Sequence, residues 1–221
     1  MTYLVDMLKA ILFVSAMFIA VFASPNAAIA ATPADTVIDG LDYGPLAQLV
    51  GTWKSDNAGG MDIAPGRAGS QVGKGGVAAS PFYETITFSP AGSAVNASEQ
   101  NLAAMYYRQQ VFRKSDNKQF HDQVGYLIYD KKSQTVYDAF CIPRAVCVVA
   151  DGKAGDAMTL TAEGQGIAQS PFMLKNDTTN KFTIALNISP TALQYREEEN
   201  LQVYDKPFTH IDADRLSKVQ D

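Results

Sequence analysis

The sequence is short of the residues that build most metal and catalytic sites. Its 221 residues include only two histidines, two cysteines and one tryptophan. Two histidines exclude a three-histidine zinc site, and so few histidines and cysteines exclude a cluster of several Cys/His ligand pairs. The chain also lacks the G-x-S-x-G nucleophile elbow, the P-loop and the H-E-x-x-H zinc motif. Any imidazole chemistry therefore falls to His121 or His210.

Positive charge is also scarce. The 18 Lys and Arg residues are outnumbered by 23 Asp and Glu residues, which gives a net charge of −5. This balance argues against a nucleic-acid-binding protein, which normally carries a basic patch or stripe. The hydrophobic fraction of 47% argues against a disordered chain. We expect a folded protein of one large or two small domains that binds no nucleic acid.

The first 30 residues have the layout of a secretory signal peptide. Lys9 precedes an apolar run from Ala10 to Ala23, and a small-residue stretch ends at Ala28-Ile29-Ala30. The run is shorter than the about 20 residues of a membrane-spanning helix. We therefore expect cleavage after residue 30, no stable membrane insertion afterwards, and export to the periplasm if the source is a Gram-negative bacterium. An uncleaved membrane anchor is the alternative.

The two cysteines, Cys141 and Cys147, lie in the segment FCIPRAVCV. Export makes a disulfide permissible. On one straight strand the two residues would lie ~20 Å apart, beyond bonding reach. Only a sharp turn at Pro143-Arg144 joins them, so the pattern favours two small buried apolar side chains and leaves a disulfide as the alternative.

Strand patterns dominate the predicted domain, which spans residues 41–221 after a leader over residues 31–40. A short helix is expected from Asp42 to Val50. Residues 58–80 contain seven glycines and predict a long loop. Alternation of apolar and polar residues then predicts strands over 82–88, 105–112, 120–129, 135–142, 146–150, 158–163, 182–188, 193–203 and 207–211.

These strands predict an all-β fold. The chain shows no βαβ alternation, and an antiparallel sheet of this size must close or fold over itself. We predict a single antiparallel up-and-down β-barrel of about ten strands, which is large enough to hold one small ligand. An ordinary packed core is the alternative explanation of its many aromatic residues.

Several segments together resemble the nitrobindin-type haem-binding β-barrels, a family similar to fatty-acid-binding proteins and lipocalins. The most recognisable is Gly51-Thr52-Trp53, a G-x-W triplet at the start of the first predicted strand. The resemblance runs from about Leu41 to Val219. The other segments that carry it are Pro45-Leu46-Ala47, Phe82–Phe88, His121–Leu127, Ile142-Pro143-Arg144 and Phe208–Asp212.

The resemblance implies ferric haem b in one mouth of the barrel, held by a single histidine near the C-terminus. His210 matches that histidine by position and is the predicted iron ligand. The other predicted cofactor-binding residues are Trp53, Tyr126 and Phe140 as aromatic surroundings and Arg144 as a partner for a propionate. A surface ion pair is the alternative role of Arg144. The activities that the family implies are reversible nitric oxide binding and peroxynitrite isomerisation.

Other polar residues receive structural interpretations. His121 is on the strand face opposite Phe120 and Tyr126, so we expect it to serve structure. Glu84 is in phase with apolar neighbours and is expected to point into the barrel. The run Glu197-Glu198-Glu199 predicts a solvated strand end and not a metal site.

Three functions remain open from the sequence. The first is an exported haem-binding barrel that uses His210 and handles nitric oxide or peroxynitrite; if it is an enzyme, it is a haem-dependent peroxynitrite isomerase. The second is a non-catalytic carrier of an apolar, lipid-like molecule in the barrel cavity. The third is a structural barrel with a packed interior. A cavity filled by side chains would count against the carrier.

Overall fold

The structure is a computed structural model that describes residues 35–70 and 73–220. The predicted signal peptide, its cleavage site and the first part of the predicted leader lie outside the described residues. Within the described part of the chain, no helix is long and apolar enough to cross a membrane.

The described chain is made almost entirely of strands. The paired strands β1 (Val37–Ile38) and β2 (Leu41–Asp42) and the 3-10 helix η1 (Gly44–Leu49) come first. The main sheet has twelve strands: β3 (Gly51–Ser55), β4 (Gly60–Pro65), β5 (Val77–Asn96), β6 (Gln100–Arg113), β7 (Gln119–Asp130), β8 (Thr135–Ile142), β9 (Val146–Lys153), β10 (Ala157–Glu163), β11 (Ile167–Gln169), β12 (Asp177–Ile188), β13 (Ala192–Val203) and β14 (Lys206–Lys218). The 3-10 helix η2 (Gly164–Gly166) and the helix α1 (Pro171–Asn176) lie in the connection from β10 to β12.

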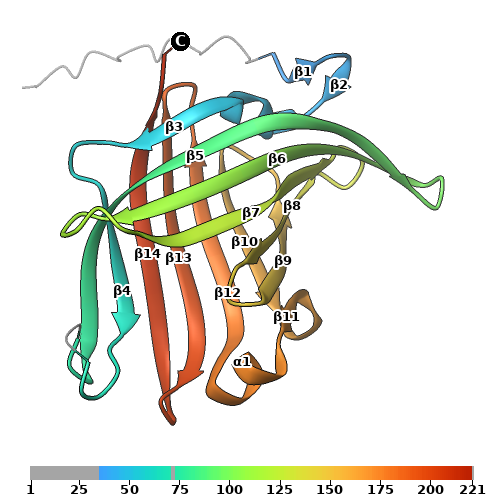
Figure 1. The fold of residues 1–221 in the computed structure, drawn as a ribbon. Helices are drawn as coiled ribbons and strands as arrows, with labels where there is room; N and C mark the ends of the chain where they lie inside the picture. Colours follow the sequence, from blue (N-terminus) through green and yellow to red (C-terminus); the bar gives the residue numbers. More distant parts are fainter. Residues whose placement is uncertain (1–34, 71–72, 221) are drawn as a thin grey trace, which may run out of the picture. The chain divides into compact units, whose positions relative to one another are not determined.

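The main sheet closes into a barrel (Figure 1). Its neighbours run in the order β10-β12-β13-β14-β3-β5-β6-β7-β8-β9, and the pair Thr161–Asp151 joins β10 back to β9. Strands β3 and β4 share one position in the wall, because both pair with β14 and with β5. The prediction of an all-β antiparallel barrel of ten strands is confirmed.

Two predicted elements differ locally from the structure. The expected helix from Asp42 to Val50 is the shorter 3-10 helix η1. The expected glycine-rich loop over residues 58–80 contains β4 and the beginning of β5. Gly60 lies in β4 against Phe82, and a Cβ at this position would lie 2.2 Å from the Phe82 ring. Only glycine allows β4 to approach β5 this closely. Glycine therefore serves close packing in β4, and loop flexibility is not its role there.

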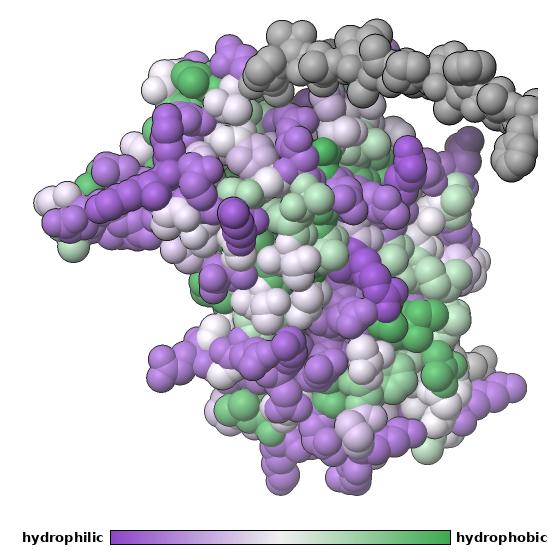
Figure 2. All heavy atoms as spheres, turned by 180° about the vertical axis from the view of Figure 1, so that it is seen from behind, coloured by the Kyte–Doolittle hydropathy of each residue, from purple (hydrophilic) through white to green (hydrophobic). Residues whose placement is uncertain are grey.

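The β5–β6 hairpin extends beyond the barrel wall (Figure 1). A bulge between Pro90 and Gly92 interrupts its ladder, and residues 89–99 are exposed. The projecting part is largely hydrophilic on the side seen in Figure 2.

One end of the barrel is filled by side chains. Trp53 is fully buried with Leu46, Leu49 and Leu216, and its indole N–H donates to the carbonyl oxygen of Leu49 at 2.6 Å. The cavity left in this half has a volume of about 40 Å³. Ligand pockets for drug-sized molecules occupy about 300 Å³ or more. The packed interior therefore counts against the carrier of a lipid-like molecule.

A disulfide joins Cys141 and Cys147, so the interpretation as two separate buried thiols is wrong. Strands β8 and β9 form a tight hairpin, in which the two residues are directly opposite each other with Cα atoms 4.1 Å apart. Ala145 takes a left-handed conformation with φ of 60° within the turn. The turn at Pro143-Arg144 thus supplies the reversal that a disulfide requires.

Reduction of this disulfide is expected to lower the free energy of unfolding by about 2 kcal/mol, because the closed loop is short. Urea unfolding with and without reductant measures the difference. The double variant Cys141→Ala/Cys147→Ala is the matched control and should be insensitive to reductant. Equal unfolding midpoints for the oxidised and reduced wild-type protein would contradict this expectation.

Candidate functional site

The inner face of β13, β14 and β4 carries a group of ionisable side chains. Across the β13–β14 ladder, Glu199 lies opposite His210 and Glu197 lies opposite Asp212. Across the β14–β4 ladder, Asp212 lies opposite Asp62. Because side chains alternate between the two faces of a strand, these five residues point to the same side of the wall.

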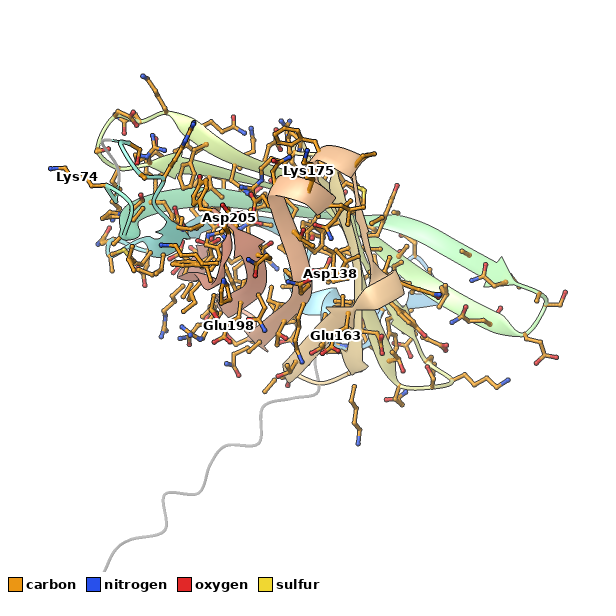
Figure 3. The ribbon with its side chains drawn as sticks, turned by 90° about the horizontal axis from the view of Figure 1, so that it is seen from below. Lys74, Asp138, Glu163, Lys175, Glu198 and Asp205 are labelled. Carbon is orange, nitrogen blue, oxygen red and sulfur yellow. A yellow bond between two sulfur atoms is a disulfide. The ribbon has the colours of Figure 1, made fainter. Side chains whose placement is uncertain are left out.

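The residue between the two inward glutamates points away from the barrel interior. Figure 3 labels this residue, Glu198, on β13. It pairs with Arg196 at 2.7 Å and keeps 42% of its side chain exposed. The expectation of a solvated strand end therefore holds only for Glu198. The alternation of a β-strand separates it from Glu197 and Glu199.

His210 is held at both ring nitrogens. Its Nδ1 lies 3.0 Å from Oε2 of Glu199, and its Nε2 lies 2.9 Å from Oδ1 of Asp62 and 3.4 Å from Oδ2 of Asp212. Burial by itself would lower the pKa of His210, but the hydrogen bonds to Asp62 and Glu199 and the charge of Asp212 raise it to about 11. At neutral pH the ring is an imidazolium that donates on both sides.

The surrounding carboxyl groups titrate in different ranges. Burial raises the pKa of Asp212 to about 7, although the charge of His210 opposes this. Burial and the charges of Glu199 and Asp212 raise the pKa of Glu197 well above its usual range. Burial also acts on Glu199, but its hydrogen bond to His210 and the charge of that ring lower its pKa. Protons and one imidazolium therefore balance much of the negative charge here.

A cavity of about 170 Å³ opens beside His210. Its wall includes His121, which faces the barrel interior, so both histidines of the chain line the same space. Nε2 of His121 lies 3.3 Å from Oε1 of Gln123, and burial and the charge of Arg144 lower the pKa of His121. His121 lies on the strand face opposite Tyr126, as expected, and this face is the inner one, because the face of β7 that carries Tyr126 is exposed. A purely structural role was expected for His121, but the structure places it in the wall of the cavity.

Arg144 also lines this cavity. It follows Pro143 in the β8–β9 turn and is exposed. Its charge acts on the pKa values of His121, Glu199 and Asp212. Among the predicted cofactor-binding residues, only His210 and Arg144 are brought together here.

The other three predicted cofactor-binding residues lie elsewhere. Trp53 pairs with Lys218 on β14, roughly 26 Å along that strand from His210. Tyr126 is 44% exposed on the outer surface, where its ring packs edge-on against Tyr106. Phe140 is buried against Phe182, with ring centroids 5.1 Å apart. The aromatic residues that do line the His210 cavity are Phe82, Phe120 and Tyr195.

A second polar network lies deeper in the barrel. Gln109 donates to Oε2 of Glu84 at 2.5 Å, and burial raises the pKa of Glu84 well above its usual range. Glu84 points inward as expected from its strand phase, and its partner is the side-chain amide of Gln109. Tyr107 donates to Oδ1 of Asp138 at 2.9 Å. Burial raises the pKa of Asp138 to about 7 despite this hydrogen bond.

Haem on His210 is a prediction of the family resemblance, and the cavity tests whether the group fits. The donor chemistry suits iron, because an Nδ1–H held by a carboxylate is the usual support of a metal-bound histidine. In the present arrangement Asp62 and Asp212 occupy Nε2, the only ring nitrogen left for iron, so haem can be held here only after they release it. The volume of about 170 Å³ is also smaller than that of a typical ligand pocket, about 300 Å³ or more. Haem therefore requires these side chains to move.

Four residues of the site were not predicted from the sequence: Asp62, Asp212, Glu197 and Glu199. The period of two places Glu197 and Glu199 on one strand face, and it does the same for His210 and Asp212. That signal was present in the sequence. Which residues face one another across the strands depends on the register of the barrel, which a local pattern does not show. Asp62 was not recognised as a strand residue, because its glycine-rich segment was predicted to be a loop.

Comparisons with known proteins agree with the fold and name the family. Residues 42–218 match the family described as the THAP4-like, heme-binding beta-barrel domain, which confirms the resemblance to nitrobindins. Among solved structures, the chain is similar to Rv2717c from M. tuberculosis, with 16% identity and a TM-score of 0.54, over 79% of this chain and 95% of that chain. No curated protein matches. Because the family match spans nearly all of the predicted domain, the chain belongs to the family of THAP4-like haem-binding β-barrel domains.

Proposed function

We propose that the protein is an exported ligand-binding barrel whose binding site is the His210 cavity, and that it takes haem there through Nε2 of His210. The observation that carries the proposal is the position of this single imidazole. It faces the barrel interior, and Nδ1 lies 3.0 Å from the carboxylate of Glu199. Haem, when bound, supplies an iron centre for small diatomic ligands.

The residues of this chain have defined roles in that proposal. Glu199 orients the ring and holds the proton on Nδ1. Phe82, Phe120 and Tyr195 supply apolar wall, and Arg144 supplies a positive charge for a carboxylate of the ligand. Asp62 and Asp212 must release Nε2 before it can bind iron. Nitric oxide binding or peroxynitrite isomerisation is the activity that we propose for the loaded protein.

Export is proposed on two grounds. Residues 1–30 have the pattern of a signal peptide. The disulfide between Cys141 and Cys147 supports the same conclusion, because such bonds persist in oxidising compartments and are rare in the cytosol.

Titration with haemin tests the proposal. We expect a Soret band that strengthens as pH rises from 7 to 10, because iron binds only the unprotonated ring and the pKa of His210 is about 11. The band should be lost in His210→Ala and kept in His121→Ala, the matched control from the same cavity. Absence of the band across this range, or equal bands in the wild type and His210→Ala, would overturn the proposal.

A further inference from the structure

Three carboxylates face one another across three neighbouring strands. Glu197 on β13 lies opposite Asp212 on β14, and Asp212 lies opposite Asp62 on β4. Like charges directly opposite each other destabilise a sheet. A row of this kind requires a counter-charge, which the His210 imidazolium supplies in the metal-free protein and a bound cation would supply in its place. We name this row of three carboxylates the acid row.

The donor atoms beside the acid row have the spacing of a metal site. Asp62, His210 and Asp212 each offer one donor atom, and these three atoms all lie within 4.8 Å of one another. Nε2 of His210 is 2.9 Å from Oδ1 of Asp62 and 3.4 Å from Oδ2 of Asp212. A tetrahedral zinc ion, with bonds of about 2.0–2.2 Å, holds its donors roughly 3.3–3.5 Å apart. Small movements would therefore place one ion between these three atoms.

Glu199 prepares the imidazole for this role. Its carboxylate lies 3.0 Å from Nδ1, which leaves Nε2 as the nitrogen that faces Asp62 and Asp212. A metal-binding histidine almost always donates its other N–H to a carboxylate, a carbonyl or water. The same contact therefore serves a bare ion as well as it would serve haem iron.

Glu197 provides an observation independent of these contacts. It lies inside the barrel and lines the cavity together with Asp62, His210 and Asp212. No hydrogen bond joins its carboxyl group to another residue in the described part of the chain. Glu197 is half-buried and borders the cavity. A carboxyl group that faces a cavity without a partner points to a ligand that completes the site. The cavity of about 170 Å³ has room for that ligand and for water molecules around it.

We propose that the cavity binds one first-row divalent cation, such as Zn²⁺, through Asp62, Nε2 of His210 and Asp212. Glu197 binds the ion or a water molecule on it. One imidazole with carboxylates suits zinc, manganese or iron(II) better than Mg²⁺ or Ca²⁺, which prefer oxygen donors alone. The proposal does not depend on haem. The ion and haem iron would compete for the same nitrogen.

Calorimetric titration of the metal-free protein with Zn²⁺ tests the proposal. We expect one ion per chain. Asp62→Asn and Asp212→Asn should each weaken binding at least about 100-fold, and Glu199→Gln about 10–100-fold. Glu198→Gln is the matched control on the outer face of β13 and should bind as the wild type does. No binding at 1 mM Zn²⁺, or unchanged affinity in Asp62→Asn and Asp212→Asn, would overturn it.

A second measurement uses the wild-type protein and does not depend on the folding of any variant. In ¹⁵N spectra of the histidine rings, Zn²⁺ should shift Nε2 of His210 and leave His121 unchanged. A shift confined to His121, or no shift at all, would contradict the site. Zinc binding without a haemin Soret band would refute only the haem proposal. A Soret band without zinc binding would refute only the cation site.

Discussion

Replacing His210 by alanine is expected to lower the free energy of unfolding by about 3–5 kcal/mol at pH 7, since this is the usual effect of removing one partner from a buried charge pair. The ring is 13% exposed and lies within 3.4 Å of three carboxylates. Alanine would leave Asp62, Glu199 and Asp212 facing one another without a counter-charge. The variant should recover part of the loss in acid, where these groups become protonated.

The other histidine of the cavity is the matched control. The ring of His121 has one hydrogen-bond partner, Gln123 at 3.3 Å, and burial lowers its pKa. His121→Ala should therefore destabilise the fold clearly less than His210→Ala. Adding Asp62→Asn to His210→Ala should restore stability, because it removes one of the unbalanced carboxylates. Urea unfolding at pH 7 measures both histidine variants. If they lose the same free energy of unfolding, His210 does not stabilise the fold as the counter-charge of these carboxylates.

The second large effect is a fall in stability as pH rises from 5 to 9. The folded-state pKa values of Asp138 and Asp212 are raised to about 7, and that of His210 is raised to about 11. A raised pKa means that the folded protein binds the proton more tightly than the unfolded chain does. The stabilisation is complete below the unfolded pKa and is lost as pH rises through the folded one. Asp138 and Asp212 therefore lower the free energy of unfolding as pH rises from about 4 to 7. His210 lowers it as pH rises from about 6.5 to 11.

Within its window, each group lowers the free energy of unfolding by about 1.4 kcal/mol per pH unit. Urea unfolding at half-unit steps from pH 5 to 9 measures the slope. Asp138→Asn is the informative variant, because it removes one buried carboxyl group whose hydrogen-bond partner is Tyr107 and should flatten the curve between pH 5 and 7. If the free energy of unfolding of the wild-type protein stays level or rises from pH 5 to 9, the raised pKa values of Asp138, Asp212 and His210 are refuted.

Strand alternation predicted most of the barrel because period two is a local property of the chain. Strand β8 spans Thr135–Ile142, the predicted range, and the prediction of ten antiparallel strands is confirmed. The faces of β7 were harder to assign. Its apolar residues Val124 and Tyr126 lie outside. Its inner face includes Gly125, where a Cβ would lie 2.6 Å from Cβ of Phe140.

The contacts of His210 could not be predicted from any local pattern in the sequence. The sequence places His210 in the last strand, and its partners come from three places: Glu199 on β13, Asp212 on its own strand and Asp62 on β4. Which of these meet is decided by the register between strands. A one-residue shift would turn every side chain of a strand to the other face. The disulfide was likewise decided by the hairpin register that sets Cys141 opposite Cys147.

The central claim is that carboxylates hold His210 as a buried cation and occupy the nitrogen that a metal would need. An NMR pH titration of the histidine rings in the metal-free wild-type protein tests it most directly. The account predicts that both nitrogens of His210 carry protons at pH 7 and that its pKa is about 11, while the pKa of His121 is below its usual value. A His210 ring that titrates near pH 6.5, with Nε2 unprotonated at neutral pH, would contradict it.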